Sequence, residues 1–207
     1  FKAIQTGGPS GGCLTPDFLD TPIDFDSMLA AGSMMGSGGA IVMDEDNCMV
    51  DVAKFYMGFI CDESCGKCTP CRIGTRRMLE ILNRITAGTG SLKDFEELAD
   101  ISEACRENSL CALGQTAANP INSTIRHFRD EYLAHIVDKK CPAGVCKDLI
   151  SYHIDPEKCE KCSLCARKCP ASAIHGELKK PFAIDPAACI RCGACRSACR
   201  LGAVTVE

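Results

Sequence analysis

The chain has 207 residues, of which 46% are hydrophobic and 24% are charged, so one large domain or two to three small ones are expected. The formal net charge of −4 argues against general nucleic-acid binding, and the apolar runs are too short to span a bilayer. The sequence starts at Phe1 and carries no signal peptide. We therefore expect a fragment of a longer cytoplasmic polypeptide that binds neither nucleic acid nor membrane.

The chain contains 18 cysteines, which must serve either disulfides or metal ions. A disulfide scaffold is normally small and secreted, and its cysteines need not cluster. Here most of the cysteines stand in triplets at spacing three, without an export signal. This pattern is typical of metal ligands in a reducing compartment, so we expect bound metal.

Residues 1–48 are rich in glycine, with turn signals such as Gly7–Gly12 and short apolar pieces such as Ala40–Met43. They predict a small β-rich segment with tight loops, followed by a linker. So few strands cannot close a core of their own. We therefore interpret this segment as truncated.

Residues 49–138 show apolar residues at helical spacing and predict a four-helix bundle with short connections. Ser91 is the expected N-cap of the third helix, with Asp94 three residues on, and Asn119 that of the fourth; Gly88 ends the second. The four apolar stripes are Val52, Phe55, Tyr56, Phe59 and Ile60; Met78, Leu79, Ile81, Leu82 and Ile85; Phe95, Leu98, Ile101 and Cys105; and Ile121, Ile125, Phe128, Tyr132 and Ile136.

Residues 139–154 are interpreted as a hinge, and residues 155–207 contain an internal repeat with a period of 30. Ile154–Pro156 recurs as Ile184–Pro186. The cysteines recur in the same way: Cys159, Cys162, Cys165 and Cys169 correspond to Cys189, Cys192, Cys195 and Cys199. Such a duplication predicts two pseudo-symmetric halves.

Each repeat reads Cys-x2-Cys-x2-Cys-x3-Cys, and residues 152–207 resemble the bacterial two-cluster [4Fe–4S] ferredoxins. Three thiolates at spacing three wrap around three corners of a cubane, and the last cysteine of the other repeat supplies the fourth. A zinc module, the alternative, favours separated pairs of cysteines. We therefore expect one cluster on Cys159, Cys162, Cys165 and Cys199, and another on Cys189, Cys192, Cys195 and Cys169.

A third triplet, Cys65, Cys68 and Cys71, lies between the first two predicted helices and has no cysteine at the following x3 position. Its fourth ligand must come from elsewhere. Cys111, across a helical hairpin, is the best candidate. We expect a third [4Fe–4S] cluster in the bundle.

The segment Glu63–Gly74 and the turn Cys111–Gly114 closely resemble the flavin-bearing, NADH-oxidising subunit of respiratory complex I and its relatives. In that family the four cysteines bind a [4Fe–4S] cluster beside FMN. The segments Gly7–Cys13, Met43–Asp51 and Lys140–Ala143, with the ferredoxin tail, are similar to the soluble branch. That branch comprises beta subunits of NAD(P)-linked, often electron-bifurcating [FeFe]-hydrogenases and NAD-dependent formate dehydrogenases.

The resemblance implies an α+β fold: the end of a β-grasp-like (SLBB-type) domain, a cluster-bearing helical bundle and a ferredoxin domain. It implies electron transfer, with FMN and NAD(P)H bound in a missing upstream domain, because the chain has no Gly-x-Gly-x-x-Gly unit and no P-loop. We identify no catalytic residue. The implied partners are the upstream flavin domain, a small [2Fe–2S] subunit and a hydrogenase or formate dehydrogenase catalytic subunit. A free-standing polyferredoxin and a zinc-rich structural module are the alternatives.

Six cysteines are not used by the three clusters. Cys141 and Cys146 form a compact two-thiolate loop, and His135 lies six residues before it. With Cys48 they would give a Cys3His site that suits zinc better than a fourth cubane. Cys13 is the rival of Cys48, and a Cys141–Cys146 disulfide or free thiols are the alternatives to a metal.

Cys61 and Cys105 fall on apolar helical stripes, so we expect them to be small buried hydrophobic residues. The remaining histidines, His127, His153 and His175, are expected on the bundle surface or on ferredoxin strands and loops.

Overall fold

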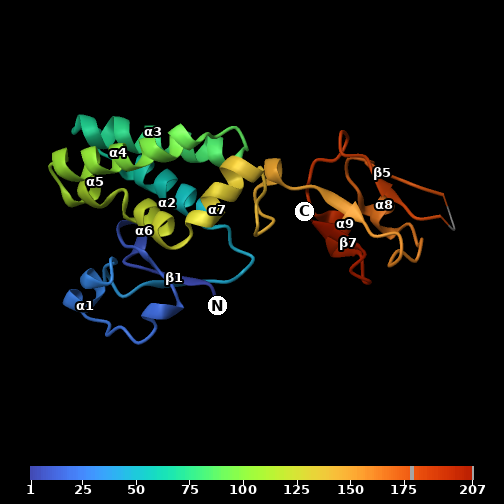
Figure 1. The fold of residues 1–207 in the computed structure, drawn as a ribbon, viewed down its shortest axis with the longest axis horizontal. Coiled ribbons are helices and arrows are strands. Elements are labelled where there is room, and N and C mark those ends of the chain that lie inside the picture. Colours follow the sequence, from blue (N-terminus) through green and yellow to red (C-terminus); the bar gives the residue numbers. More distant parts are fainter. Residues whose placement is uncertain (178–179, 207) are drawn as a thin grey trace. The chain divides into compact units, whose positions relative to one another are not determined.

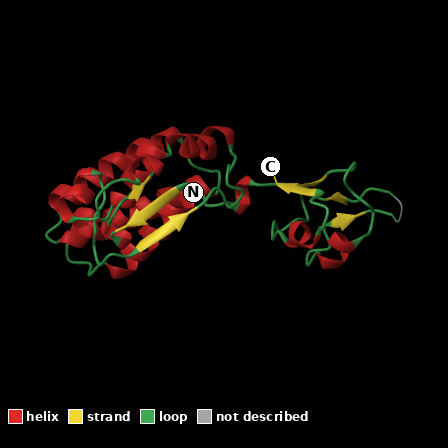
Figure 2. Ribbon diagram, turned by 90° about the horizontal axis from the view of Figure 1, so that it is seen from below, coloured by secondary structure: helices red, strands yellow, loops and turns green. Residues whose placement is uncertain are grey.

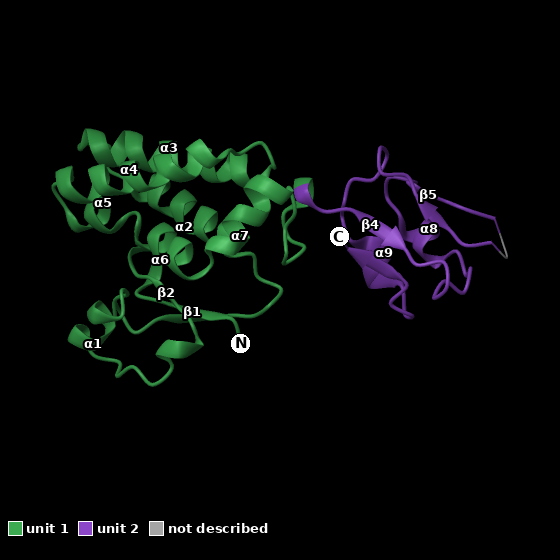
Figure 3. Cartoon of the chain, viewed as in Figure 1, with its two compact units in different colours: residues 1–148 green, residues 149–207 purple. Residues whose placement is uncertain are grey.

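The computed structural model describes residues 1–177 and 180–206. The chain divides into two compact units, residues 1–148 and 149–207 (Figure 3). Both units contain helices and strands, so the expected mixture of helix and strand is confirmed (Figure 2). Among the described residues, every helix is too short or too polar to cross a membrane.

Three short strands near the N-terminus form an antiparallel sheet in the first unit (Figure 1). They are β1 (Ala3–Thr6), β2 (Cys13–Leu14) and β3 (Ala40–Met43), in the order β2-β1-β3. The buried side chains of Ala3, Cys13 and Met43 pack together with Met49. Because Met49 opens the next long helix, the sheet shares its core with the helical part. A short helix, α1 (Phe25–Ala30), lies between β2 and β3 in the sequence.

The next helices of the first unit are α2 (Met49–Glu63), α3 (Thr69–Thr86), α4 (Leu92–Asn108) and α5 (Ala112–Thr116). α3 packs against both α2 and α4 (Figure 1). Most of their large, fully buried side chains are aliphatic or methionine, including Met57, Met78, Ile81, Leu82, Ile85 and Leu98, and the hydroxyl-bearing Thr75 is buried among the residues of α3.

The predicted ends of two helices are confirmed. The Ser91 hydroxyl accepts a hydrogen bond from the Asp94 amide, and the Asp94 carboxylate accepts one from the Ser91 amide, which makes a capping box at α4. Gly88 follows the end of α3 with a φ of +77°, the left-handed conformation that glycine adopts without steric cost.

The predicted stripe of α2 is wrong for two of its aromatic residues. Phe55 is 66% exposed and Phe59 is 48% exposed. The helix instead buries Ala53, Met57 and Ile60, at the i, i+4, i+7 spacing of one face. Phe55 and Phe59 are offset from this face by about half a turn because each residue advances the helix by about 100°. The buried face of α2 therefore combines Ala53, Met57 and Ile60 with only one aromatic residue, Tyr56.

The predicted fourth helix is interrupted. It consists of α6 (Asn119–His127), α7 (Arg129–Leu133) and a π-helical turn (Ala134–Asp138). The break lies at Phe128, whose φ of −132° is outside the helical region. The hydrophobic period alone does not report such a break, because the apolar residues keep their spacing across it.

The predicted N-cap of this helix is also wrong. Ala118 occupies the cap position of α6, and Asn119 is already helical. The side-chain amide of Asn119 donates to the carbonyl of Ser10 at 2.8 Å. A long-range contact to the glycine-rich loop therefore replaces the local cap.

The second unit has the expected two-fold repeat. Its helices, α8 (Leu164–Lys168) and α9 (Ala194–Ala198), are 30 residues apart. Its strands are β4 (Tyr152–Ile154), β5 (Ile174–His175), β6 (Ala183–Ile184) and β7 (Val204–Val206). β4 pairs with β7 and β5 pairs with β6, so each half exchanges strands with the other. The buried residues between the halves are Ile174, Phe182, Cys195 and Val204.

Candidate metal centres

The first unit contains a cavity of about 240 Å³ where α2 and α4 end and where α3 and α5 begin. It is lined by the whole predicted ligand set, Cys65, Cys68, Cys71 and Cys111, together with Glu63, Ser64, Ser109 and Leu113. Cys65 and Cys68 lie in the connection between α2 and α3, and Cys71 lies in the first turn of α3. Cys111 is the residue before α5. The packing of α3, α4 and α5 thus brings Cys111 to the triplet.

The loop of the triplet is held in shape by its own side chains. Gly66 has a φ of +75°, which allows the tight turn between the first two cysteines. The Arg72 guanidinium donates to the Gly66 carbonyl at 2.7 Å. Cys68 lies at the N-cap of α3, where backbone N–H groups favour negative charge. The loop therefore suits a group that carries negative charge.

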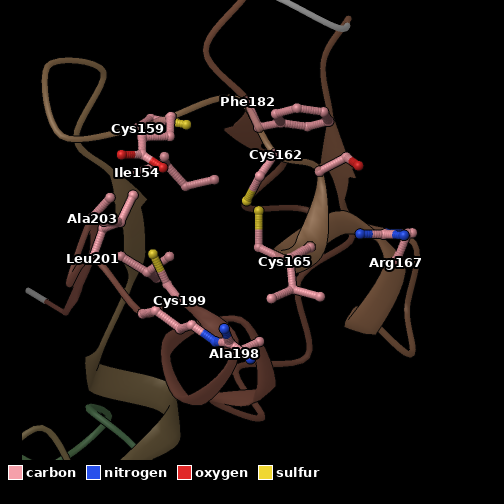
Figure 4. Close-up of a pocket in the computed structure, with 15 residues that line it drawn as sticks. Ile154, Cys159, Cys162, Cys165, Arg167, Phe182, Ala198, Cys199, Leu201 and Ala203 are labelled. Carbon is pink, nitrogen blue, oxygen red and sulfur yellow. The ribbon is translucent and has the colours of Figure 1, made fainter.

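The first cavity of the second unit has a volume of about 420 Å³. Its lining includes the predicted set Cys159, Cys162, Cys165 and Cys199. The sulfurs of Cys162 and Cys165 point toward one another (Figure 4). Cys199 comes from the second half of the repeat, so residues of both halves meet at this cavity.

The second cavity of this unit is lined by the other predicted set, Cys189, Cys192, Cys195 and Cys169. It is much smaller, about 10 Å³. Cys169 accepts a backbone hydrogen bond from Ala173, and Cys189 accepts one from Arg191. Such N–H groups stabilise charge on sulfur.

Each half of the repeat also contributes one aromatic residue to the cavity of the other half. The sequence analysis did not identify these two residues. Phe182 lines the first cavity and Tyr152 lines the second, so each ring lies beside the cysteine triplet of the other half. Burial raises the pKa of Tyr152, which stays a neutral phenol. The two positions are 30 residues apart, so the repeat itself was the signal that could have revealed them.

A fourth group of candidate ligands lies in the first unit. The ligand atoms of Cys48, His135, Cys141 and Cys146 all lie within 4.8 Å of one another, and all four residues are buried. His135 Nε2 is 3.3 Å from both Cys48 Sγ and Cys146 Sγ. His135 Nδ1 donates to the Glu131 carbonyl at 2.7 Å, which leaves Nε2 free to bind.

The sulfur spacing of this group fits a tetrahedral metal. Cys48 Sγ and Cys146 Sγ are 3.7 Å apart. Zn–S bonds of about 2.3 Å in a tetrahedron place two sulfurs about 3.8 Å apart. All 18 cysteines have free thiols, so Cys141 and Cys146 are close without being bonded to each other.

The electrostatics of the group also favour a cation. Burial alone would lower the pKa of His135, but hydrogen bonds with Cys141 and Cys48 raise it to about 10. Hydrogen bonds from Cys146 and Cys48 lower the pKa of Cys141. Hydrogen bonds with Cys141 and Cys48 raise the pKa of Cys146, so negative charge in this buried group is favoured on Cys141. A bound cation in place of the His135 proton would compensate that charge.

The other cysteines lie outside these four groups. Cys13 is part of the sheet core, and burial raises its pKa to about 12, so it is not the partner of His135 here. Cys105 is buried and donates its thiol proton to the Pro70 carbonyl at 3.2 Å. Cys61 is half-buried, which is more exposed than expected for a core residue.

The remaining histidines are solvent-accessible. His127 is half-buried, with its ring edge-on to Phe18 at 5.6 Å. His153 lies on β4 and His175 on β5, and both are exposed.

Comparison with known proteins supports iron–sulfur binding by both units. Residues 51–135 match the NADH-ubiquinone oxidoreductase-F iron-sulfur binding region, and residues 151–200 match the 4Fe-4S dicluster domain. The chain is 57% identical over 181 residues to the NADP-reducing hydrogenase subunit HndC of Solidesulfovibrio fructosivorans, covering 87% of this chain and 37% of that protein. It is 46% identical over 142 residues to a subunit of the NADH-quinone oxidoreductase of Mycobacterium tuberculosis, covering 69% of this chain and 32% of that protein.

A solved structure is also similar. The NAD+-reducing [NiFe]-hydrogenase in the H2-reduced state matches with a TM-score of 0.60 and 36% identity, covering 65% of this chain and 22% of that chain. The chain spans about a third of the length of the curated relatives it matches. The resemblance expected from the motifs is confirmed. Residues 51–135 form an iron–sulfur binding region of the NADH-ubiquinone oxidoreductase-F kind, and residues 151–200 form a 4Fe–4S dicluster domain.

Proposed function

We propose that this chain is the electron-relay part of an NAD(P)H-linked oxidoreductase subunit and that it holds three [4Fe–4S] clusters. The observation that carries the proposal is the presence of three separate cavities, each lined by four cysteines. Four thiolates around one cavity are the ligand set of a cubane cluster. When bound, such clusters accept and donate single electrons.

Each cavity implies one ligand set. In the first unit, Cys65, Cys68, Cys71 and Cys111 would hold the cluster that we call the bundle cluster. In the second unit, one cluster would be held by Cys159, Cys162, Cys165 and Cys199, and the other by Cys189, Cys192, Cys195 and Cys169. Residues 139–207 carry a formal charge of +5, which would offset the negative charge of reduced clusters.

The fourth group would hold a structural zinc ion through Cys48, His135, Cys141 and Cys146. Its support is the burial of all four residues and the sulfur spacing of 3.7 Å. Zinc has no redox chemistry, so its role would be to fix residues 141–146 to the helical part. These residues immediately precede the second unit.

The proposal also assigns the helices and the sheet of the first unit to two parts of the larger subunit. α2, α3, α4 and the interrupted segment α6–α7 would be the four members of a helical bundle. The sheet of β1, β2 and β3 would be the end of a β-grasp-like domain. The hydrogenase relative at 57% identity favours a hydrogenase over a formate dehydrogenase as the parent enzyme. The upstream flavin domain, a small [2Fe–2S] subunit and the hydrogenase catalytic subunit would then be its partners in the cytoplasm.

The proposal is tested by metal and sulfide analysis of the anaerobically reconstituted chain. We expect about 12 iron and about 12 sulfide per chain, from three four-iron clusters, together with one zinc. About eight iron would reject the bundle cluster. Zinc in place of iron, without acid-labile sulfide, would reject the electron-transfer function and favour the structural module.

A second measurement distinguishes a free-standing polyferredoxin from part of a larger complex. The full-length protein, purified anaerobically from its own cells, is expected to carry flavin and to copurify with a hydrogenase catalytic subunit. A protein that purifies alone and without flavin would favour the polyferredoxin.

A further inference from the structure

The cavity of the proposed bundle cluster contains a hydroxyl group that the protein leaves without a partner. Ser109 is 5% exposed and lines this cavity. Within residues 1–177 and 180–206, its Oγ neither donates nor accepts a hydrogen bond. Buried hydroxyl groups are nearly always paired, because an unpaired one loses its hydrogen bonds to water. The position of Ser109 therefore calls for an acceptor in the cavity.

The backbone of Ser109 is held on both sides, which fixes where the hydroxyl can reach. Its N–H donates to the Cys105 carbonyl at 3.2 Å, and its carbonyl accepts from the Gln115 side chain at 3.0 Å. A Cβ placed on Gly114 would lie 2.5 Å from Ser109 Oγ. The missing side chain of Gly114 thus leaves the space that the hydroxyl occupies.

A second hydroxyl in the same cavity shows what such a group can do there. Ser64 Oγ lies 3.4 Å from Cys71 Sγ, within hydrogen-bond distance for sulfur. Ser64 comes from the end of α2 and Ser109 from the end of α4. Two hydroxyls thus approach the cavity from different helices. Among the described protein atoms, Ser64 has a sulfur partner and Ser109 has none.

We propose that Ser109 donates its O–H to a sulfur of the bundle cluster, and that this hydrogen bond raises the reduction potential of that cluster. The inference rests on the proposed function, because it requires the cluster in this cavity. Reduction adds one electron and increases the negative charge on the sulfurs. A donor aimed at sulfur stabilises the reduced form more than the oxidised form, which raises the potential. Ser109 would thus set the reduction potential of the cluster without being one of its ligands.

The test is Ser109→Ala in the complete chain, reconstituted anaerobically. Iron and sulfide are measured first, and the potential then follows from a redox titration monitored by EPR. The bundle signal is identified as the one that Cys111→Ala removes. We expect unchanged iron, and a reduction equilibrium about tenfold less favourable, which for a one-electron couple is a shift of about −59 mV. The two ferredoxin clusters should keep their potentials.

The matched control is Ser102→Ala. Ser102 lies on the same helix and is also buried, but its hydroxyl donates to the Leu98 carbonyl at 2.6 Å and it does not line the cavity. Its removal should leave the bundle potential unchanged. A Ser109→Ala protein that keeps its full iron content and the native reduction potential of the bundle cluster would overturn the inference. Absence of the bundle signal in the unmodified chain would instead reject the proposed function.

A second variant covers the case in which Ser109→Ala loses the bundle cluster. Ser109→Thr keeps the hydroxyl, so it should restore both the iron and the native potential. Loss of the cluster in both variants would show that Ser109 acts through packing, and would overturn the inference. In the unmodified protein, an exchangeable proton coupled to the reduced bundle cluster, which persists in Ser64→Ala, is the expected spectroscopic signature.

Discussion

The proposed bundle site and the two proposed ferredoxin sites each consist of four cysteines, but the cysteines are brought together by different kinds of structure. At the bundle site, Cys111 follows Cys71 by 40 residues and is positioned by packed helices. Those helices bury many aliphatic and methionine side chains, among them Met78, Ile81 and Leu98. Within its described residues, the second unit has two two-stranded sheets and a central cluster of four buried residues. Four cysteines can thus be added to a domain that has its own hydrophobic core, as in the first unit, or can stand in a domain with a very small core, as in the second.

This difference has an energetic meaning. Domains well below 70 residues rarely stabilise themselves by a hydrophobic core alone, and a two-stranded hairpin is marginal in water. The second unit comprises residues 149–207, so we expect that binding of the proposed clusters contributes to its folding. The first unit, with 148 residues and its own core, does not have this requirement.

The largest expected effect is therefore the selective unfolding of the second unit when the clusters are removed. After oxidation and chelation of iron, residues 149–207 should lose protection against hydrogen exchange and proteolysis. The helices α2, α3 and α4 should persist in the far-UV circular dichroism spectrum. The reconstituted chain is the control. Continued protection of residues 149–207 without iron would contradict the comparison.

The next effect concerns the exchange of ligands between the two halves. Cys169→Ala should damage the cluster on Cys189, Cys192 and Cys195 and leave the cluster adjacent to it in the sequence intact. The reason is that Cys169 lines the cavity of the other half's triplet. Mössbauer and EPR spectra should show a three-iron or missing cluster. Cys105→Ala, which removes a buried cysteine outside the three cluster cavities, is the control.

Cys111→Ala should lower the iron content from about 12 to about eight while the helices remain. Because the bundle has its own core, this variant should unfold no unit, unlike removal of the clusters of the second unit. Iron analysis and circular dichroism on one sample give both quantities. Unchanged iron would mean that Cys111 is not a ligand, and loss of helix would mean that the bundle, too, depends on its cluster.

A smaller effect is expected at the zinc group. Cys141→Ser should abolish zinc binding, measured by elemental analysis, and leave the iron content and cluster spectra unchanged. The reason is that the four proposed zinc ligands line none of the three cysteine-lined cavities. Cys13→Ser is the control, because Cys13 is buried but lies outside the group. Zinc at full occupancy in Cys141→Ser would contradict the assignment.

The sequence predicted which cysteines come together better than it predicted the packing around them. Ligands of one triplet are three residues apart, so the chain itself places them together. The partner of each triplet was inferred from the repeat or from a resemblance, and the fold brings Cys111, Cys169 and Cys199 to those cavities. These predictions depend on short spacing and on symmetry, both of which are visible in one dimension.

What the sequence did not reveal depends on tertiary contacts. Phe55 and Phe59 were placed on the buried face of α2 because they are large and apolar. The residues that the helix actually buries include Ala53, Met57 and Ile60. The amide of Asn119 bonds to Ser10, which is 109 residues away. Ser109 is one serine among several, and only the cavity that it lines shows its unpaired hydroxyl.

The smallest expected effect tests the independence of the first unit through the cap of α4. Ser91→Ala removes the hydroxyl that accepts from the Asp94 amide and should lower the free energy of unfolding by about 1 kcal/mol. The measurement is urea unfolding of the metal-free chain, followed by circular dichroism. A transition midpoint that does not change would show that the cap is not formed when iron is absent. Thr116→Ala, at an exposed hydroxyl bonded within α5, is the control.

The carboxylate of the same cap adds a pH dependence with a defined sign. Burial would raise the pKa of Asp94, but hydrogen bonds from Arg84 and Ser91 hold it below its ordinary value. A carboxyl group with a lowered folded pKa stabilises the fold above its unfolded pKa of about 4, and this contribution is lost as the pH falls below that value. In Asp94→Asn, this part of the acid destabilisation should be missing, so its unfolding free energy should vary less between pH 5 and 3 than that of the unmodified metal-free chain. Equal pH dependence of the two proteins would mean that Asp94 is not ionised in a cap, and that α4 in the metal-free bundle is not held as the complete structure shows it.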